Sequence, residues 1–155
     1  MSGAVEGVFH PAINVSDMTE AVRYYRDLLG LTVTFDDDHD PQAISALFGY
    51  TDPLVHAVVV GCPDGSELEL VRFERPQGKT RVERQVKDAG ILSVNLRVTE
   101  LEDVVARLTA GGYPPLSEVV PQVLPDGGVI KVQVCPAPDG VTIILVELPA
   151  GRARL

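Results

Sequence analysis

The sequence contains two copies of one pattern. The segment Pro63–Val71 (PDGSELELV) returns 75 residues later as Pro138–Val146 (PDGVTIILV). Upstream, Ile13–Asp17 (INVSD) returns 83 residues later as Leu96–Glu100 (LRVTE). Because a repeat at this spacing is one supersecondary unit, we expect two equivalent modules. The positions at which the two copies differ are then the most informative ones for function.

Hydrophobic alternation and turn signals predict the order β-α-β-β-β for the first copy. The D-x-x-E pattern of Asp17 and Glu20 marks the start of its helix. Gly30 marks the end of that helix. The expected strands cover Val8–Val15, Leu31–Phe35, Leu54–Gly61 and Ser66–Phe73.

The second copy repeats the order. Thr99 and Glu102 form a T-x-x-E capping box that is expected to start its helix, and Gly111 with Gly112 is expected to end it. The expected strands cover Ile91–Val98, Ser117–Val120, Val129–Val134 and Val141–Glu147.

The first copy is longer by about eight residues, and the extra length must lie within Asp36–Pro53. This segment begins as an acidic loop (DDDHD) and ends with the apolar stretch Ala43–Phe48. A loop lengthened in only one of two copies favours a lid or binding loop. Residues Glu74–Gly90, which include Arg81 and Arg84, are expected to form a solvated linker between the two copies. The less favoured alternative is that the basic residues of this segment bind a phosphate or carboxylate group of a substrate.

The composition limits the classes of function. A chain of 155 residues is long enough for one domain with its own core. A net charge of −9 argues against nucleic-acid binding. We expect no membrane contact and a cytoplasmic location, because no apolar run of about 18 residues and no signal-peptide pattern occurs. Cys62 and Cys135 lack metal-ligand spacing and are expected to be reduced structural thiols.

The segment HPAINVSDMTEAVRYYRDLLGL, the turn-strand PDGSELELV and the second copy ending in PDGVTIILVEL resemble the vicinal oxygen chelate superfamily. That group includes glyoxalase I, methylmalonyl-CoA epimerase, extradiol dioxygenases, fosfomycin-resistance enzymes and metal-free bleomycin-binding proteins. The resemblance covers about residues 8–148. It implies a single α+β domain of two βαβββ modules (8–73 and 91–148, joined by linker 74–90) that form an incomplete curved barrel around one cleft. It also implies a homodimer, with halves from one chain or from two facing each other.

The resemblance further implies four inward positions that hold a metal in metal-using relatives. In this chain they are His10 and Glu69 in the first copy, and Ser93 and Ile144 in the second. The first copy therefore keeps an imidazole and a carboxylate, whereas the second has lost both. Strand alternation independently places Glu69 on the face opposite Leu68 and Leu70.

A divalent ion such as zinc, nickel, cobalt, manganese or iron would suit this pair of donors. Two protein ligands alone make a weak site, since catalytic zinc sites usually supply three. A further ligand could come from the Asp36–Asp40 loop with its His39, from His56, from Glu67, or from a second subunit. The single matching histidine argues most against an extradiol dioxygenase, whose iron requires two.

Two functions from different classes follow. The first is a glyoxalase- or epimerase-type enzyme with a reduced metal site, in which Glu69 is ligand, proton carrier or both. The second is a metal-free small-molecule binding protein of the bleomycin-resistance kind. Its ligand would contact Ile144 and the apolar stretch that contains Phe48. A third possibility is a metal-independent enzyme that uses Glu69, or the pair of His10 and Glu69, as its acid–base group. The expected substrate-binding residues are Ser93, Asn95, Arg97, Ile144 and Phe48.

Overall fold

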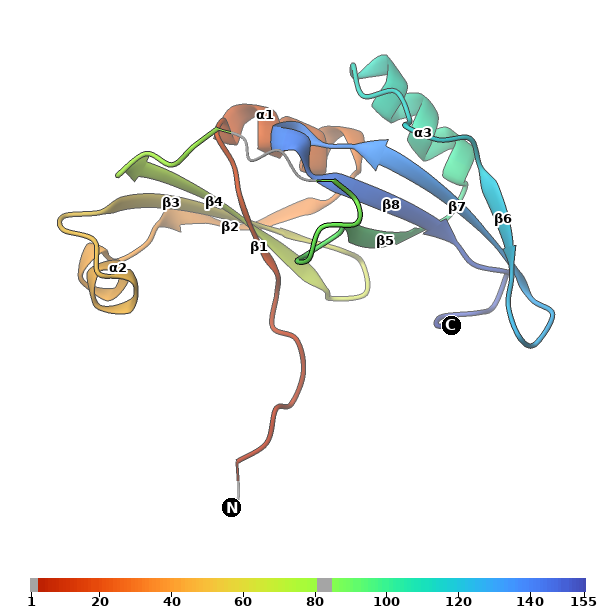
Figure 1. The fold of residues 1–155 in the computed structure, drawn as a ribbon, viewed down its shortest axis with the longest axis horizontal. Coiled ribbons are helices and arrows are strands. Elements are labelled where there is room, and N and C mark those ends of the chain that lie inside the picture. The colour runs from red at the N-terminus through yellow and green to blue at the C-terminus, as the bar shows by residue number, and fades with distance from the viewer. Residues whose placement is uncertain (1–2, 81–84) are drawn as a thin grey trace. The chain divides into compact units, whose positions relative to one another are not determined.

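A computed structural model describes residues 3–80 and 85–155 of the chain (Figure 1). The chain divides into two compact units, with the boundary after Thr80. Each unit contains one four-stranded mixed sheet, in the order β1-β4-β3-β2 in the first and β5-β8-β7-β6 in the second. The predicted linker residues Arg81 and Arg84 lie outside the described residues.

The order of elements along the chain confirms two β-α-β-β-β modules, with one added helix in the first. The first unit contains β1 (Ala12–Asn14), α1 (Met18–Val22), the π-helical turns η1 (Arg23–Leu28), β2 (Thr32–Asp38), α2 (Pro41–Phe48), β3 (Leu54–Gly61) and β4 (Glu67–Arg75). The second contains β5 (Val94–Val98), α3 (Leu101–Ala110), β6 (Val120–Val123), β7 (Val129–Pro136), the short 3-10 turn η2 (Pro138–Gly140) and β8 (Thr142–Glu147).

The strand register shows that the two units are copies of each other. In the first, β1 runs parallel to β4 with Ala12 opposite Glu69. In the second, β5 runs parallel to β8 with Asn95 opposite Ile144. These two pairs are related by the offsets of 83 and 75 residues in the sequence. The predicted α+β class is therefore confirmed, and in the described residues neither sheet closes into a barrel.

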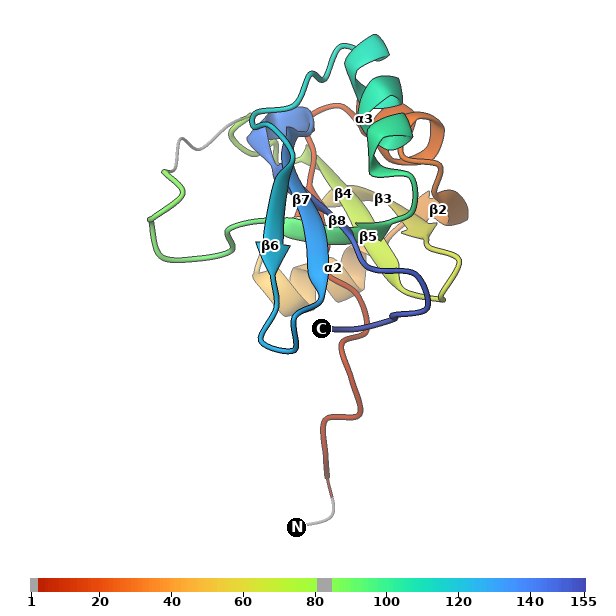
Figure 2. The ribbon, with the colours of Figure 1, turned by 90° about the vertical axis from the view of Figure 1, so that its right-hand side faces the viewer.

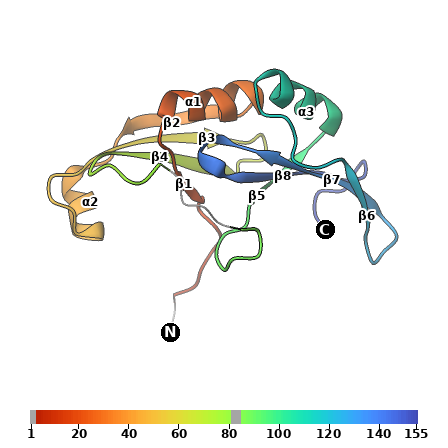
Figure 3. The same ribbon diagram turned by 45° about the horizontal axis from the view of Figure 1, so that its top comes forward.

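The first unit buries one face of its sheet under α1 and η1. Leu70 of β4 and Tyr24 of η1 are completely buried, and Figure 3 shows α1 lying along this side of the sheet. Each fully buried side chain of this size contributes roughly 1.5–3 kcal/mol. The buried residues of this face and its helices include Ile13, Met18, Ala21, Tyr24, Tyr25, Val58, Val60, Leu68 and Leu70.

The second unit packs α3 on its own sheet in the same way (Figure 2). Ile143 and Leu145 of β8 are completely buried, whereas Ile144 between them is half-buried on the opposite face. Cys135 of β7 is also buried, and burial raises the pKa of its thiol, as suits a structural cysteine. Among the described residues, the helices are too short or too polar to cross a membrane.

The first strand of each copy is shorter than predicted. β1 begins only at Ala12, and Phe9, which lies within the predicted strand Val8–Val15, is 85% exposed. Pro11 has no amide hydrogen to donate to the sheet, although its carbonyl still accepts a hydrogen bond from Glu69 N (3.0 Å). β5 begins at Val94, which lies opposite Ile143 of β8.

The two helices start differently, although their sequence signals look alike. The prediction for α1 is confirmed, because Asp17 Oδ1 accepts a hydrogen bond from Glu20 N (3.0 Å). The capping box predicted at Thr99 is wrong. The residue before α3 is Glu100, in a left-handed conformation and without a side-chain cap. The cap comes instead from β8, where Glu147 Oε2 accepts from Leu101 N (2.7 Å).

Glu147 is therefore expected to stabilise the second unit through α3. Glu147→Ala should lower the free energy of unfolding by about 1 kcal/mol at pH 7, the usual loss for a helix cap. Thr99→Ala is the matched control and should leave it unchanged, since Thr99 is exposed and does not cap. Urea unfolding followed by circular dichroism measures both; equal losses would contradict this assignment.

The effect of Glu147→Ala should also depend on pH. The Leu101 N–H and then Lys131 lower the pKa of the Glu147 carboxyl in the folded chain. A carboxyl whose pKa is lowered by folding stabilises the fold above its unfolded pKa of about 4.3, and this contribution is lost as the pH falls. The difference between wild type and Glu147→Ala should therefore shrink between pH 7 and pH 3.

Candidate functional site

The candidate site is centred on Glu69, in the interior strand β4. Its neighbours in the sheet are Ala12 of β1 and Val59 of β3. Leu68 and Leu70 on either side point into the helix-covered core, so Glu69 points to the opposite face, as predicted. Its side chain is only 13% exposed. A carboxylate at such a position needs polar partners, because burying one without them is costly.

His10 is the first of these partners. The hydrogen bond from Glu69 N to the Pro11 carbonyl holds the chain before β1 beside β4. It brings His10 Nε2 to 3.5 Å from Glu69 Oε2, with the His10 side chain 17% exposed. The predicted proximity of His10 and Glu69 is thus found in the structure. The other ring nitrogen of His10, Nδ1, is buried without a hydrogen-bond partner among the described residues.

His39 is the second partner, and its contact is the closer one. Its Nε2 lies 2.9 Å from the other carboxylate oxygen, Glu69 Oε1. The sequence indicated His39 only as one of several possible extra ligands, because nothing in its local pattern shows which way the segment folds. Each oxygen of Glu69 therefore has an imidazole nitrogen beside it. Hydrogen bonds to a charged acceptor contribute about 1.5–3 kcal/mol, which offsets the desolvation of the carboxylate.

The segment that carries His39, for which the sequence favours a lid or binding loop, contains regular structure. β2 extends to Asp38, and the apolar stretch forms the helix α2, which ends at Gly49 in a left-handed conformation. Ile44 of α2 packs against Val55 and Val71, on the same sheet face as Glu69. Phe48 lies at the exposed end of this helix (62% exposed) and is not part of that packing.

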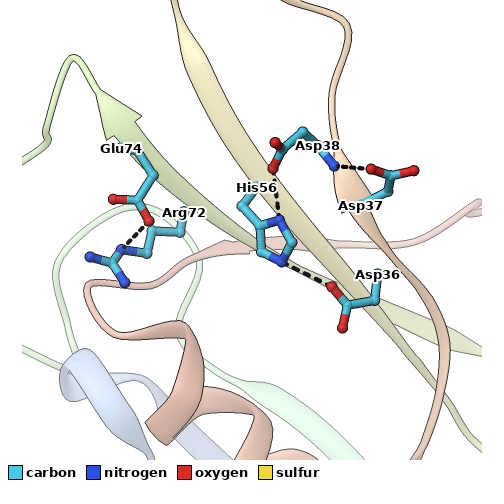
Figure 4. A network of polar contacts seen from close by, with 6 residues as sticks. All are labelled: Asp36, Asp37, Asp38, His56, Arg72 and Glu74. Atoms are coloured by element: carbon cyan, nitrogen blue, oxygen red, sulfur yellow. Dashed lines mark hydrogen bonds and ion pairs between the residues drawn. The ribbon is translucent and has the colours of Figure 1, made fainter.

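His56, the other histidine considered from the sequence, lies on the opposite face of the sheet from Glu69. It sits beside Arg72, which is on the other side of β4. Its ring bridges two carboxylates of β2, with Nε2 3.0 Å from Asp36 and Nδ1 2.8 Å from Asp38 (Figure 4). His56 therefore does not supply a further donor to Glu69. Glu67 does share the face of Glu69, but it accepts a hydrogen bond from Thr34 (3.0 Å).

The predicted residues of the second copy lie in the second unit. Ser93 donates to the Asn95 side chain (2.6 Å), so these two form a small polar group at the start of β5. Arg97 donates to the Ala153 carbonyl (2.6 Å) in the C-terminal segment. Ile144 lies opposite Asn95 in the sheet. Their predicted role in binding a substrate stays a prediction.

The donors around Glu69 fit a metal ion in type but not in arrangement. Two imidazoles and a carboxylate are ligands that borderline divalent ions accept. In the part of the chain that the structure describes, however, no group of three or more His, Cys, Asp or Glu side chains is placed to hold a metal ion. The observed contacts are instead a hydrogen bond between His39 and Glu69 and a looser contact of 3.5 Å between His10 Nε2 and Glu69 Oε2.

Comparison with known proteins identifies the family. Residues 7–145 match the model of the Glyoxalase/Bleomycin resistance protein/Dioxygenase superfamily, and the chain belongs to it. This confirms the resemblance seen in the sequence. The superfamily contains both enzymes and resistance proteins, so membership by itself does not decide the activity.

Solved structures agree on the fold. A glyoxalase family protein from Bacillus cereus is 23% identical with a TM-score of 0.82, covering 95% of this chain and 97% of that one. The trypanothione-dependent glyoxalase I of Leishmania major is 20% identical with a TM-score of 0.63, covering 92% and 87%. A glyoxalase family protein from Enterococcus faecalis is 19% identical with a TM-score of 0.64, covering 92% and 98%. The search of curated proteins finds no match.

Proposed function

We propose that this chain is a small-molecule enzyme of the glyoxalase or epimerase type, in which Glu69 transfers a proton. The observation that carries the proposal is the carboxylate of Glu69, largely buried in an interior strand and flanked by two imidazoles. A positioned carboxylate of this kind is an effective general base, typically contributing a factor of 10²–10⁴ to the rate. The superfamily and the resemblance to glyoxalases and epimerases support this reaction class.

The substrates that suit this site are small carbonyl compounds with a second oxygen on the neighbouring carbon. Glu69 takes the proton from that carbon, and the electrons of the broken C–H bond move towards the carbonyl oxygen. His10, whose Nε2 lies 3.5 Å from Glu69 Oε2, is held more loosely than His39 and can donate its N–H to the carbonyl oxygen of the substrate. Delivery of the proton held by Glu69 to the former carbonyl carbon, while the second oxygen releases its hydroxyl proton to solvent, gives an isomer. Protonation of the original carbon on its opposite face by water, with the proton held by Glu69 released to solvent, gives an epimer.

A metal-dependent form of the same enzyme is the second candidate, favoured by the donor types around Glu69. His10 and Glu69 would hold the divalent ion, as the resemblance implies, and the ion would polarise the substrate oxygens. The remaining alternative is a binding protein without catalysis. It is favoured by the exposed apolar side chains of Leu47 and Phe48 on α2.

Proton transfer can be measured before the natural substrate is known. We expect the protein to exchange the C–H hydrogen of some 2-hydroxy carbonyl compounds for deuterium in D₂O, followed by proton NMR. Glu69→Gln should slow this exchange by at least about 100-fold, because it removes the base while keeping the shape. Glu67→Gln, on the same strand face, is the matched control and should have little effect.

The outcomes of this experiment separate enzyme from binding protein. Exchange that persists in Glu69→Gln would refute the assignment of the base. Tight binding of compounds of this class without any exchange would refute the enzyme and support the sequestering alternative.

The role of a metal can be tested by thermal unfolding. After dialysis against a chelator, we expect stoichiometric nickel or manganese to leave the melting temperature unchanged, since the described residues place no group of three His, Cys, Asp or Glu side chains to hold an ion. An ion bound at 100 times its dissociation constant would add about 2.7 kcal/mol of stability. A rise in melting temperature that disappears in both His10→Ala and Glu69→Ala would instead establish the metal-dependent form.

The homodimer and the cytoplasmic location remain predictions from the sequence and the family resemblance. Light scattering of the purified protein is expected to give twice the mass of one chain. A monomer at micromolar concentration would contradict the first of them.

A further inference from the structure

We propose that His39 positions the carboxylate of Glu69, and that the segment between β2 and β3 serves to hold His39 in place. This inference rests on the proposed role of Glu69 as the proton-transferring group. It assigns a function to the extra residues of the first copy, which the sequence suggested to be a lid.

The first argument is the contact itself. His39 Nε2 lies 2.9 Å from Glu69 Oε1, within the range of a good hydrogen bond. The matching distance from His10 Nε2 to Glu69 Oε2 is 3.5 Å, at the outer limit. His39 therefore holds one oxygen of the carboxylate firmly and leaves the other with a weaker partner.

The second argument is that the backbone of His39 is fixed to the sheet. Its amide N–H donates to the carbonyl of Val55 at 2.9 Å, which continues the pairing of β2 with β3 by one residue. Pairing of the backbone in the sheet fixes the face of the sheet on which the side chain of His39 lies. The direction of His39 is thus set by the sheet that also carries Glu69.

The third argument is that both sequence neighbours of His39 are anchored. Asp38 accepts a hydrogen bond from His56 Nδ1 at 2.8 Å, as Figure 4 shows. Asp40 caps α2, because its Oδ1 accepts from Gln42 N at 2.9 Å. The residues before and after His39 are therefore each fixed by a hydrogen bond of an aspartate side chain.

The fourth argument is that α2 is tied to the same sheet face. Ile44, at 7% exposure, packs on Val55 and Val71, and Phe73 packs beside them. Val71 lies two residues beyond Glu69, so the anchor of the helix and the carboxylate share one face of β4. The helix that follows His39 is therefore packed on the sheet face that carries Glu69.

The second unit provides an internal comparison. There β6 ends at Val123 and β7 begins at Val129, with only a turn between them. The position equivalent to Glu69 is Ile144, which has no charge to orient. The added helix thus occurs in the copy that has a carboxylate and is missing from the copy that has none.

The contact can be tested without any substrate. With ¹⁵N-labelled protein at pH 7, we expect Glu69→Gln to shift the ring-nitrogen resonances of His39 by several ppm, because the strongest partner of that ring changes. The resonances of His56, on the other face of the sheet, serve as the internal reference and should stay in place. Unchanged His39 resonances would overturn the proposal.

The positioning role is then tested by kinetics of the deuterium exchange. His39→Ala should lower kcat by about 10–100-fold with little change in KM, the size typical for loss of an orienting partner. His39→Gln keeps a donor and should restore part of the rate. Gln42→Ala, an exposed substitution in the same segment, is the matched control and should leave kcat unchanged.

These readouts separate the two proposals from each other. A wild type without exchange on any compound refutes the proposed function, while the ring-nitrogen spectra still decide whether His39 holds Glu69. Wild-type exchange that is unaffected in His39→Ala refutes the positioning role alone. An equal loss in His39→Ala and His39→Gln, with the fold intact by circular dichroism, would also refute it.

Discussion

The first unit depends on a carboxylate placed where strands normally carry apolar side chains. Glu69 lies in an interior strand with a buried core on the reverse side, and its charge must be satisfied locally. The two imidazoles, one from before β1 and one from after β2, meet this need from two sides. The hydrogen bond from Glu69 N to Pro11 and the bond from His39 N to Val55 are then explained together, since each fixes the chain that delivers an imidazole.

The two units have the same architecture but different side chains at equivalent positions. Their sheets have the same strand order and the same register, so Glu69 and Ile144 occupy equivalent places. The first copy has an added helix and two histidines beside Glu69. The second copy has the apolar side chain of Ile144 at the equivalent position and only a short turn between β6 and β7. Superfamily membership accounts for the shared framework. The copies differ at the position of Glu69 and Ile144 and in the segment between the second and third strands of each sheet.

Much of this could be predicted from particular residues. Strand alternation placed Glu69 on the sheet face opposite Leu68 and Leu70, and the family resemblance placed His10 near it; the structure has both. The cap of α3 could not be predicted, because Glu147 is 46 residues away from Leu101 along the chain and meets it only through the sheet. The side on which His56 lies depended on the register of β3 with β4, which alternation within β3 alone does not reveal.

The amino-acid sequence alone determined the class of fold, the two equivalent modules and the asymmetry between Glu69 and Ile144. These follow from local periodicity and from repetition, which are properties of short segments. Only the tertiary structure decided that Ala43–Phe48 is a helix anchored on the sheet and that His39 reaches Glu69. The reason is that the packing of Ile44 and the hydrogen bond to Val55 join residues distant in the chain, and no local pattern encodes which distant partner a side chain will meet.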